Sequence, residues 1–305
     1  MAQPRSSLII CSRDRPRLLH DTIRSVLQGA ELPSEIVVVD QSRVPHEQLS
    51  DPQAGGPCEV RYLWARSVGL SRARNEGIAA ARHDLIVIID DDMFVESTWF
   101  GSFTRALVNA GPRAVVTGRV LAAPAEVPRG FAPTLAVREA PAIYQGRIGT
   151  EVLAGGHMAA FRSAFQEVGG FDERLGAGAL YPAADDNDLG FRLLEAGYRI
   201  VYVPEAVVYH RAWRSGVEYF RVRWSYGLGK GGYYAKYLSL RDRYMLRRMV
   251  YDVSHRVYGF PLRLWRDRRL ATGDPAYVLG ILVGATRWLL TQPRDGRTAS
   301  PIGTR

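Results

Sequence analysis

Three adjacent aspartates, Asp90, Asp91 and Asp92, follow the apolar run Leu85–Ile89. Such a run is typical of a strand buried on both faces. Two carboxylates ~4 Å apart repel each other by ~1 kcal/mol in water and by ~4 kcal/mol at a semi-buried site. Solvent, basic neighbours or a cation must offset that repulsion. The cluster is therefore either a solvated loop or a site for Mg²⁺ or Mn²⁺, with Asp90 and Asp92 on one side of the extended chain.

Two arginines, Arg72 and Arg74, follow Ser71, where the pattern predicts that a helix begins. A cation in the first turn is disfavoured by the helix dipole by ~0.3–1 kcal/mol. Either both side chains bend into solvent, or they bind an anion such as a phosphate or the acidic cluster. The guanidinium group is suited to bidentate contacts of this kind.

A second acidic group, Asp185, Asp186 and Asp188, precedes the helical pattern "LGFRLLEAG". Aspartates at this position cap a helix and complement its dipole, which is one explanation for them. Helical spacing also places Asp186 on the same face as Leu189 and Leu193. A carboxylate that points inward in a cleft is a candidate general base.

A single histidine, His210, ends the apolar run "VVYH". Taken alone it fits an ordinary core or rim residue. Together with Asp92 it would complete a metal site, because imidazole is a common metal ligand.

These residues fall at the ends of predicted strands. We expect strands over 6–12, 35–42, 59–65 and 84–90, with helices over 15–30 and 69–82. Near-continuous apolar strands that alternate with helices indicate an α/β fold with a mostly parallel central sheet flanked by helices. In such sheets ligands bind beyond the carboxyl ends of the strands. The polar residues expected at those ends are Ser12, Arg13, Asp40 and Asp90 to Asp92.

The 305 residues, of which 47% are hydrophobic, allow a large core and exclude a disordered chain. Two cysteines, Cys11 and Cys58, form neither a disulfide framework nor a zinc pattern. The start of the chain has no signal-peptide pattern, so cytoplasmic residence is expected. No Gly-x-Gly-x-x-Gly follows the first strand, which disfavours a dinucleotide oxidoreductase.

The charge is unevenly distributed. Residues 211–305 hold 19 Lys and Arg against 6 Asp and Glu, a net charge of +13, whereas residues 1–210 carry −4. Residues 276–290 form a mostly apolar run of 15, which is short for a membrane-spanning helix of ~20 residues. We interpret the tail as basic, aromatic helices that lie on an anionic membrane surface, with packing on the body or on a partner subunit as the alternative. Nucleic acid is not expected as a partner, because no recognised module accompanies the charge.

The order of these motifs resembles glycosyltransferase family 2. The matching segments cover roughly residues 5–215 and read "LIICSRDRPRLLHDTIRSVLQ", "EIVVVDQS", "GLSRARNEGIAAARHDLIVIIDDD", "MAAFRSAFQEVGGFDERLG" and "DDNDLGFRLLEAGYRIVYVPEAVVYH". The resemblance implies an A-type glycosyltransferase fold over 1–215, with a nucleotide-binding half (1–92), an acceptor half (93–215) and a helical appendage (216–305). It also implies an inverting, metal-dependent hexosyl or deoxyhexosyl transfer from a nucleoside-diphosphate sugar.

The resemblance assigns the donor side by position. Asp40 would bond the base, with Ser12 and Arg13 in the same pocket. Arg74 would contact the base or the diphosphate, and Asp90 would meet the ribose. The N3–H of uracil or thymine suits an aspartate as its acceptor, so a UDP- or dTDP-sugar is favoured.

The resemblance likewise assigns the metal and the chemistry. Asp92, with Asp90 and His210 nearby, would hold Mg²⁺ or Mn²⁺. Asp186 matches the usual catalytic base, and Asp185 stands where the family commonly has a glutamate. The residues implied to face the donor sugar or the acceptor are His157, Met158 and Trp224.

Processive relatives carry a Gln-x-x-Arg-Trp element, which Arg223 and Trp224 match, but Phe220 replaces the glutamine. We therefore expect a single-addition enzyme that extends a glycan, lipid-linked and at the inner face of the cell membrane. The alternatives are a metal-dependent nucleotidyltransferase or phosphohydrolase, and a non-catalytic nucleotide-sugar-binding membrane scaffold.

Overall fold

The computed structural model describes residues 4–46, 58–128, 130–132, 135–211, 213–239, 241–266 and 268–291. The chain forms two compact units, Met1–Tyr219 and Phe220–Arg305.

The first half of unit 1 is a parallel sheet. Its strands are β1 (Ser6–Ser12), β2 (Glu35–Asp40), β3 (Glu59–Trp64) and β4 (Leu85–Asp90), in the order β3-β2-β1-β4. Helices α1 (Pro16–Leu27) and α3 (Leu70–Ala80) connect them, as the sequence predicts. The helix expected to open at Ser71 begins one residue earlier, and Ser71 Oγ instead donates to the carbonyl of Leu175.

The second half makes the sheet mixed. Strand β8 (His157–Phe161) pairs antiparallel with β4 and with β6 (Ala114–Ala122), and β6 pairs parallel with β9 (Arg199–His210). The short strands β5 (Met93–Val95) and β7 (Ala142–Tyr144) pair antiparallel with β9.

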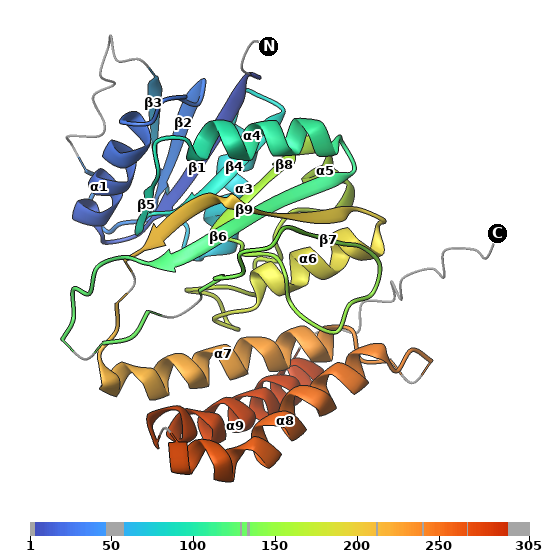
Figure 1. Ribbon diagram of the computed structural model, residues 1–305. Helices are drawn as coiled ribbons and strands as arrows, with labels where there is room; N and C mark the ends of the chain where they lie inside the picture. The colour runs from blue at the N-terminus through green and yellow to red at the C-terminus, as the bar shows by residue number, and fades with distance from the viewer. Residues whose placement is uncertain are drawn as a thin grey trace. The chain divides into compact units, whose positions relative to one another are not determined.

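Helices cover both faces of this sheet (Figure 1). Alternate residues along β1 belong to different cores, since Leu8 and Ile10 pack with α1 and α4 (Trp99–Ala110), whereas Ile9 packs with α3 and α6 (Asp185–Glu195). The short helix α5 (Arg162–Val168) joins the second core. Period-two alternation between two buried faces explains why the strands are almost wholly apolar.

Strand register places the polar strand ends together. Ser12 lies opposite Asp40, and Cys11 lies opposite Asp90. The carboxyl edge of the parallel strands is therefore an acidic rim, as predicted.

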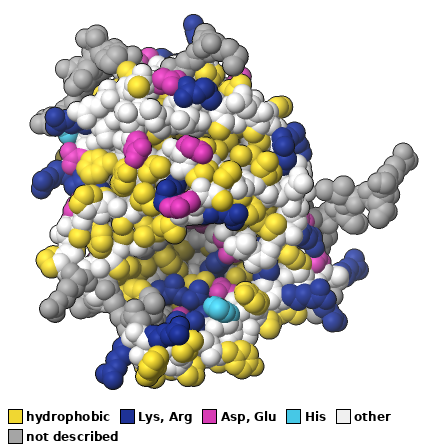
Figure 2. Space-filling model, viewed as in Figure 1, with side chains coloured by type: hydrophobic (Ala, Val, Ile, Leu, Met, Phe, Trp, Pro, Cys, Tyr) yellow, Lys and Arg dark blue, Asp and Glu magenta, His cyan; other side chains and the backbone are white. Residues whose placement is uncertain are grey.

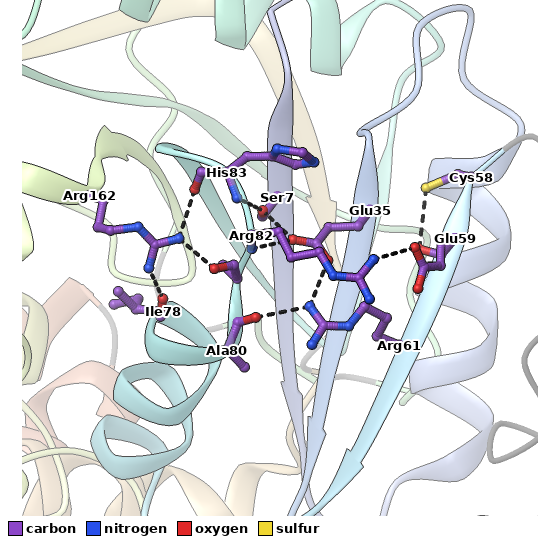
Figure 3. Close-up of polar contacts among 11 residues, drawn as sticks. Ser7, Glu35, Cys58, Glu59, Arg61, Ile78, Ala80, Arg82, His83 and Arg162 are labelled. Atoms are coloured by element: carbon purple, nitrogen blue, oxygen red, sulfur yellow. Dashed lines mark hydrogen bonds and ion pairs between the residues drawn. The ribbon is translucent and has the colours of Figure 1, made fainter.

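The amino edge of the same strands is closed by a buried carboxylate, Glu35 (Figure 3). One of its oxygens accepts from Ser7 Oγ and from the Arg82 N–H, both at 2.6 Å, and the other accepts from Arg61 at 2.7 Å. Nearby, the Arg162 guanidinium donates to three carbonyls where α3 leads into β4. Charge at this edge is thus fully matched inside the protein.

Unit 2 holds α8 (Tyr244–Arg266), α9 (Arg268–Thr291) and most of α7 (Gly216–Lys236). Helices α7 and α9 meet backbone to backbone. A Cβ on Gly231 would lie 2.2 Å from the Ile281 carbonyl oxygen, and one on Gly284 would lie 2.2 Å from that of Leu228. Each helix has two glycines four residues apart at this contact, Gly227 and Gly231 on α7 and Gly280 and Gly284 on α9, which allow the close approach. Among the described residues, no helix has the length and apolar character needed to cross a bilayer.

We predict that Glu35→Gln destabilises unit 1 by about 1–3 kcal/mol, because an amide in place of the carboxylate leaves buried donors without an acceptor. Urea unfolding measures the change. Glu59→Gln is the matched control, since Glu59 begins the neighbouring strand but is exposed; it should change stability by less than about 0.5 kcal/mol.

The same pair of variants gives a pH signature. Burial favours the neutral form of Glu35, yet the hydrogen bonds from Ser7, Arg82 and Arg61 outweigh it and lower the pKa. The stabilisation is therefore present above the unfolded pKa of about 4.3 and is lost as pH falls through the lower folded value. A difference between the protein and Glu35→Gln that grew on acidification would contradict this account.

Candidate functional site

Arg74 joins the two acidic groups of the sequence. Its side chain is buried, with 2% of its surface exposed. One terminal nitrogen donates to Asp185 at 2.6 Å and the other to Asp90 at 2.8 Å. Helix α3 lies close enough for this because a Cβ on Gly77 would come within 2.5 Å of Ile9. The end of β4 and the start of α6 are therefore held by one cation.

Two glycines cover this ion-pair network. The Gly156 carbonyl accepts from the Asp90 N–H at 3.1 Å. A Cβ on Gly156 would lie 1.9 Å from a carboxylate oxygen of Asp90, and one on Gly155 would lie 2.8 Å from the Cβ of Asp186 and 3.0 Å from Arg74. Only glycine fits here without displacing these charged side chains.

Asp91 and Asp92 point to a second cation, Arg15, which lies just before α1. One Arg15 nitrogen lies 3.1 Å from an oxygen of each carboxylate. Asp91 also accepts from Ser12 Oγ at 2.6 Å. Burial, with the charge of Asp92, raises the pKa of Asp91 to about 6. Asp91 is thus held by protein groups on the α1 side of the strand end.

Asp92 also meets His210, as the sequence predicts for a metal site. His210 Nε2 lies 3.1 Å from Asp92 Oδ1. Although burial opposes ionisation, the hydrogen bond and charge of His210 and the charge of Arg15 lower the pKa of Asp92. Arg214, which is half-buried, adds a further cation at this end.

Residues Asp92 and His210 fit a divalent cation that shares its coordination with a substrate. Within the described parts of the chain, no three His, Cys, Asp or Glu side chains come together as a complete metal site. Mg²⁺ sites commonly use only one or two carboxylates and complete the shell with water and substrate phosphates. An adjacent carboxylate oxygen and imidazole nitrogen provide such a partial set.

The three aspartates of α6 have different surroundings. Asp185 is buried against Arg74, and Asp188 is buried against Arg192, which donates to it at 2.9 Å. Asp186 is half-buried, and its Oδ1 accepts from the Asn187 N–H at 2.8 Å. No aspartate caps the helix, because the N-cap residue is Ala184, but all three lie in the first turn, where they complement the helix dipole. The inward position predicted for Asp186 is wrong, since Asp186 is the most accessible of the three carboxylates.

Asp40 is buried at the end of β2. Ser42 donates to one of its oxygens, and the Tyr62 hydroxyl donates to the other at 2.6 Å. His46 Nε2 lies 3.5 Å away. Arg13, predicted to share this pocket, is exposed and lies 3.9 Å from Asp14.

His157 and Met158 lie in the core and not at the rim. His157 accepts a hydrogen bond from Trp99 Nε1 at 2.8 Å and stacks on Phe103. Burial lowers its pKa to about 3, so the ring is neutral. Trp224 lies on α7 within unit 2. The structure therefore does not bring the side chains of His157 and Met158 to the acidic rim.

Three features of the site are not predicted from the sequence motifs, namely Arg15, Tyr62 and the glycine pair Gly155-Gly156. Arg15 directly precedes Pro16, and a proline at the first helical position predicts that Arg15 is the N-cap residue of α1. The adjacent glycines in "AGGH" were a signal for close backbone approach. No local signal points to Tyr62, whose contact with Asp40 comes from strand pairing.

Comparison with known proteins gives a consistent result. The family model "Glycosyltransferase like family 2" matches residues 4–227. The pre-mycofactocin glycosyltransferase of Mycobacterium tuberculosis is 33% identical over 183 residues, 57% of this chain and 37% of that protein. The glucosyl-dolichyl phosphate glucuronosyltransferase of Haloferax volcanii is 27% identical over 235 residues, 72% and 74% of the two chains.

Among solved structures, a mannosyltransferase from Pyrobaculum calidifontis in complex with GDP-Man and Mn²⁺ matches with a TM-score of 0.59. The identity is 15%, and the match covers 94% of this chain and 88% of that one. This likeness confirms the predicted A-type glycosyltransferase fold. The chain spans little more than a third of the mycobacterial relative's length, at 37%.

We predict that Arg74→Gln destabilises unit 1 by about 3 kcal/mol or more, because it leaves Asp90 and Asp185 without their counter-charge. Thermal and urea unfolding measure the loss. Arg72→Gln on the same helix is the control, since Arg72 is exposed and, within the described part of the chain, forms an ion pair only with the exposed Glu173. It should change stability by less than about 0.5 kcal/mol. Equal effects of the two variants would refute the central role of Arg74.

Proposed function

The chain belongs to glycosyltransferase family 2, as its motifs predict, and we propose that it transfers a sugar from a nucleoside-diphosphate sugar to a hydroxyl acceptor with inversion. The observation that carries the proposal is the double contact of Arg74 with Asp90 and Asp185. It ties the expected donor-binding strand end to the helix that carries the expected base. Donor and acceptor chemistry would then meet at one rim.

On the donor side, Asp90 is the carboxylate of the aspartate triplet that remains most open, and we assign it to the ribose. Asp40 is assigned to the base, where Ser42 and Tyr62 orient it. A carboxylate accepts the N3–H of uracil or thymine, which favours a UDP- or dTDP-sugar. The transferred group would be a hexose or a deoxyhexose.

Asp92 and His210 would hold Mg²⁺ or Mn²⁺. A divalent cation bound there supplies positive charge that stabilises a diphosphate leaving group. Arg15 and Arg214 lie at the same end of β4 and add fixed positive charge. Such preorganised charge acts where negative charge develops in the transition state.

Asp186 is assigned as the general base. Its carboxylate is half-buried and lies beside Gly155, which also adjoins Arg74. It would accept the proton of the attacking hydroxyl while that oxygen forms the bond to the anomeric carbon. Attack opposite the leaving diphosphate inverts the configuration at that carbon. We assign the neighbouring Asp185 to positioning, since Arg74 occupies it.

The acceptor is assigned to the glycans, either free or lipid-linked. The haloarchaeal relative is named for a glucosyl-dolichyl phosphate, which is a lipid-linked sugar. That name supports a lipid-linked acceptor for this chain but does not specify the lipid or the linkage.

We predict that one of UDP, dTDP, GDP and CDP binds in a Mn²⁺-dependent manner, and that Asp92→Asn weakens this binding at least about tenfold. Isothermal titration calorimetry with and without metal measures it. Asp84→Asn is the matched control, because Asp84 immediately precedes β4 at its other end and its side chain is 90% exposed. Metal-independent binding, or none, would overturn the assignment.

We predict that Asp186→Asn leaves nucleotide affinity unchanged but lowers turnover by about 10²–10⁴-fold. The rate is measured as release of the nucleoside diphosphate from the donor sugar. Because water can act as a slow acceptor, the assay needs no known acceptor. An unchanged rate with intact binding would exclude Asp186 as the base, whereas lost binding would show that it acts in donor binding.

A further inference from the structure

Helix α8 carries three large aromatic side chains on one outward face. Tyr251, Tyr258 and Trp265 have 66%, 84% and 82% of their surface exposed. They are spaced seven residues apart, so they form a stripe along the helix. Further exposed apolar residues flank this aromatic stripe, namely Val250, Val257, Leu262 and Leu264. Aromatic side chains in this number are normally covered by a partner or a lipid.

Helix α8 exposes arginines on its outward face and turns its carboxylate inward. Arg247 and Arg266 are exposed at the two ends of the stripe. The one carboxylate of the helix, Asp252, points inward, where it accepts from Tyr234 at 3.1 Å and from Tyr277 at 2.9 Å and pairs with Arg256. The outward face of α8 is therefore apolar, aromatic and basic, with no acidic side chain.

A second inward-facing carboxylate, Asp274 on α9, keeps two arginines of α8 on the inward side. Asp274 on α9 accepts from Arg263 at 2.5 Å and from Arg256 at 3.2 Å. Arg256 and Arg263 thus form ion pairs on the inward side of α8 and do not contribute charge to its outward face. The positive charge that stays outward flanks the aromatic stripe and is available to an anionic partner.

We propose that the aromatic stripe of α8 docks on the surface of an anionic phospholipid bilayer. Tyrosine and tryptophan rings settle at the level of the lipid headgroups, and arginines pair with lipid phosphates. A helix with one apolar, aromatic face and flanking basic residues lies in the interface plane and does not cross it. The absence of acidic groups from this face matches a negatively charged surface. This inference does not depend on the chemistry of the rim in unit 1.

The full chain is tested by co-sedimentation with two kinds of vesicle, phosphatidylcholine alone and an equal mixture of phosphatidylcholine and phosphatidylglycerol. We expect binding to the mixed vesicles only, weakened by high salt. The variant Tyr251→Ser/Tyr258→Ser/Trp265→Ser should lose at least about tenfold in affinity. The control Val137→Ser/Ile143→Ser removes exposed apolar residues from unit 1 and should bind like the unmodified protein.

A second readout locates the contact. Lipids brominated near the headgroup should quench tryptophan fluorescence in the unmodified protein, and Trp265→Phe should remove most of that quenching. Nucleotide binding, measured on the same samples, should be equal in all variants, so a failure of the glycosyl-transfer proposal leaves this test intact.

Three outcomes would overturn the proposal. The first is equal vesicle binding by the stripe variant and the control. The second is absence of binding to the anionic vesicles. The third is a self-association of the protein that the stripe variant abolishes without any vesicle binding, which would assign the surface to a second copy of the chain.

Discussion

The buried guanidinium of Arg74 is the constraint around which unit 1 is arranged. A charge removed from water is tolerated only when opposite charges surround it, and Asp90 and Asp185 provide them at 2.8 and 2.6 Å. Those carboxylates come from β4 and α6, which are distant in sequence. Closing the ion pairs therefore fixes the end of the central sheet against the helix that carries Asp186. The glycines at 155 and 156 are required because this network leaves no room for a side chain above it.

The two edges of the parallel strands show what distinguishes a structural charge cluster from a functional one. At the amino edge the buried carboxylate, Glu35, receives three donors and is satisfied by the protein alone, whereas Glu59 and Asp84 at the same edge are exposed. At the carboxyl edge four carboxylates share two arginines and one histidine. Negative charge there exceeds the fixed positive charge unless His210 is protonated and Arg214 contributes. An excess of this kind favours binding of a cation.

The sequence predicts features that depend on one segment of the chain, and it does not predict features that depend on contacts between distant segments. Buried strands and their polar ends are read from apolar runs, so the sequence predicts that Asp90 and His210 end strands and that Asp92 meets His210. It does not predict that Asp90 turns to Arg74 while Asp92 turns to Arg15 and His210. Helix α4 was not predicted, although Trp99, Phe103 and Leu107 follow helical spacing. The choice of Arg15 over Arg13, and the burial of His157 under Trp99, depend on contacts between distant segments. Helical spacing also favoured Asp186 as the inward residue, whereas tertiary ion pairs bury Asp185 and Asp188 more deeply.

Composition alone does not predict what the basic tail binds, because a net charge does not say which charged side chains face outward. Packing within unit 2 determines which of these side chains face inward and which face outward. Glycines at the contact of α7 and α9 bring their backbones together, and the inward tyrosines and arginines then enclose Asp252 and Asp274. Both described carboxylates of α8 and α9 are thereby withdrawn from the surface, and the aromatic stripe is left with arginines as its charged neighbours. The same residues in a helix rotated by half a turn would bury Trp265 and would expose Asp252 together with Arg256 and Arg263, so the aromatic stripe would be lost. The membrane docking that we propose would thus depend on how this unit packs, and not on its net charge alone.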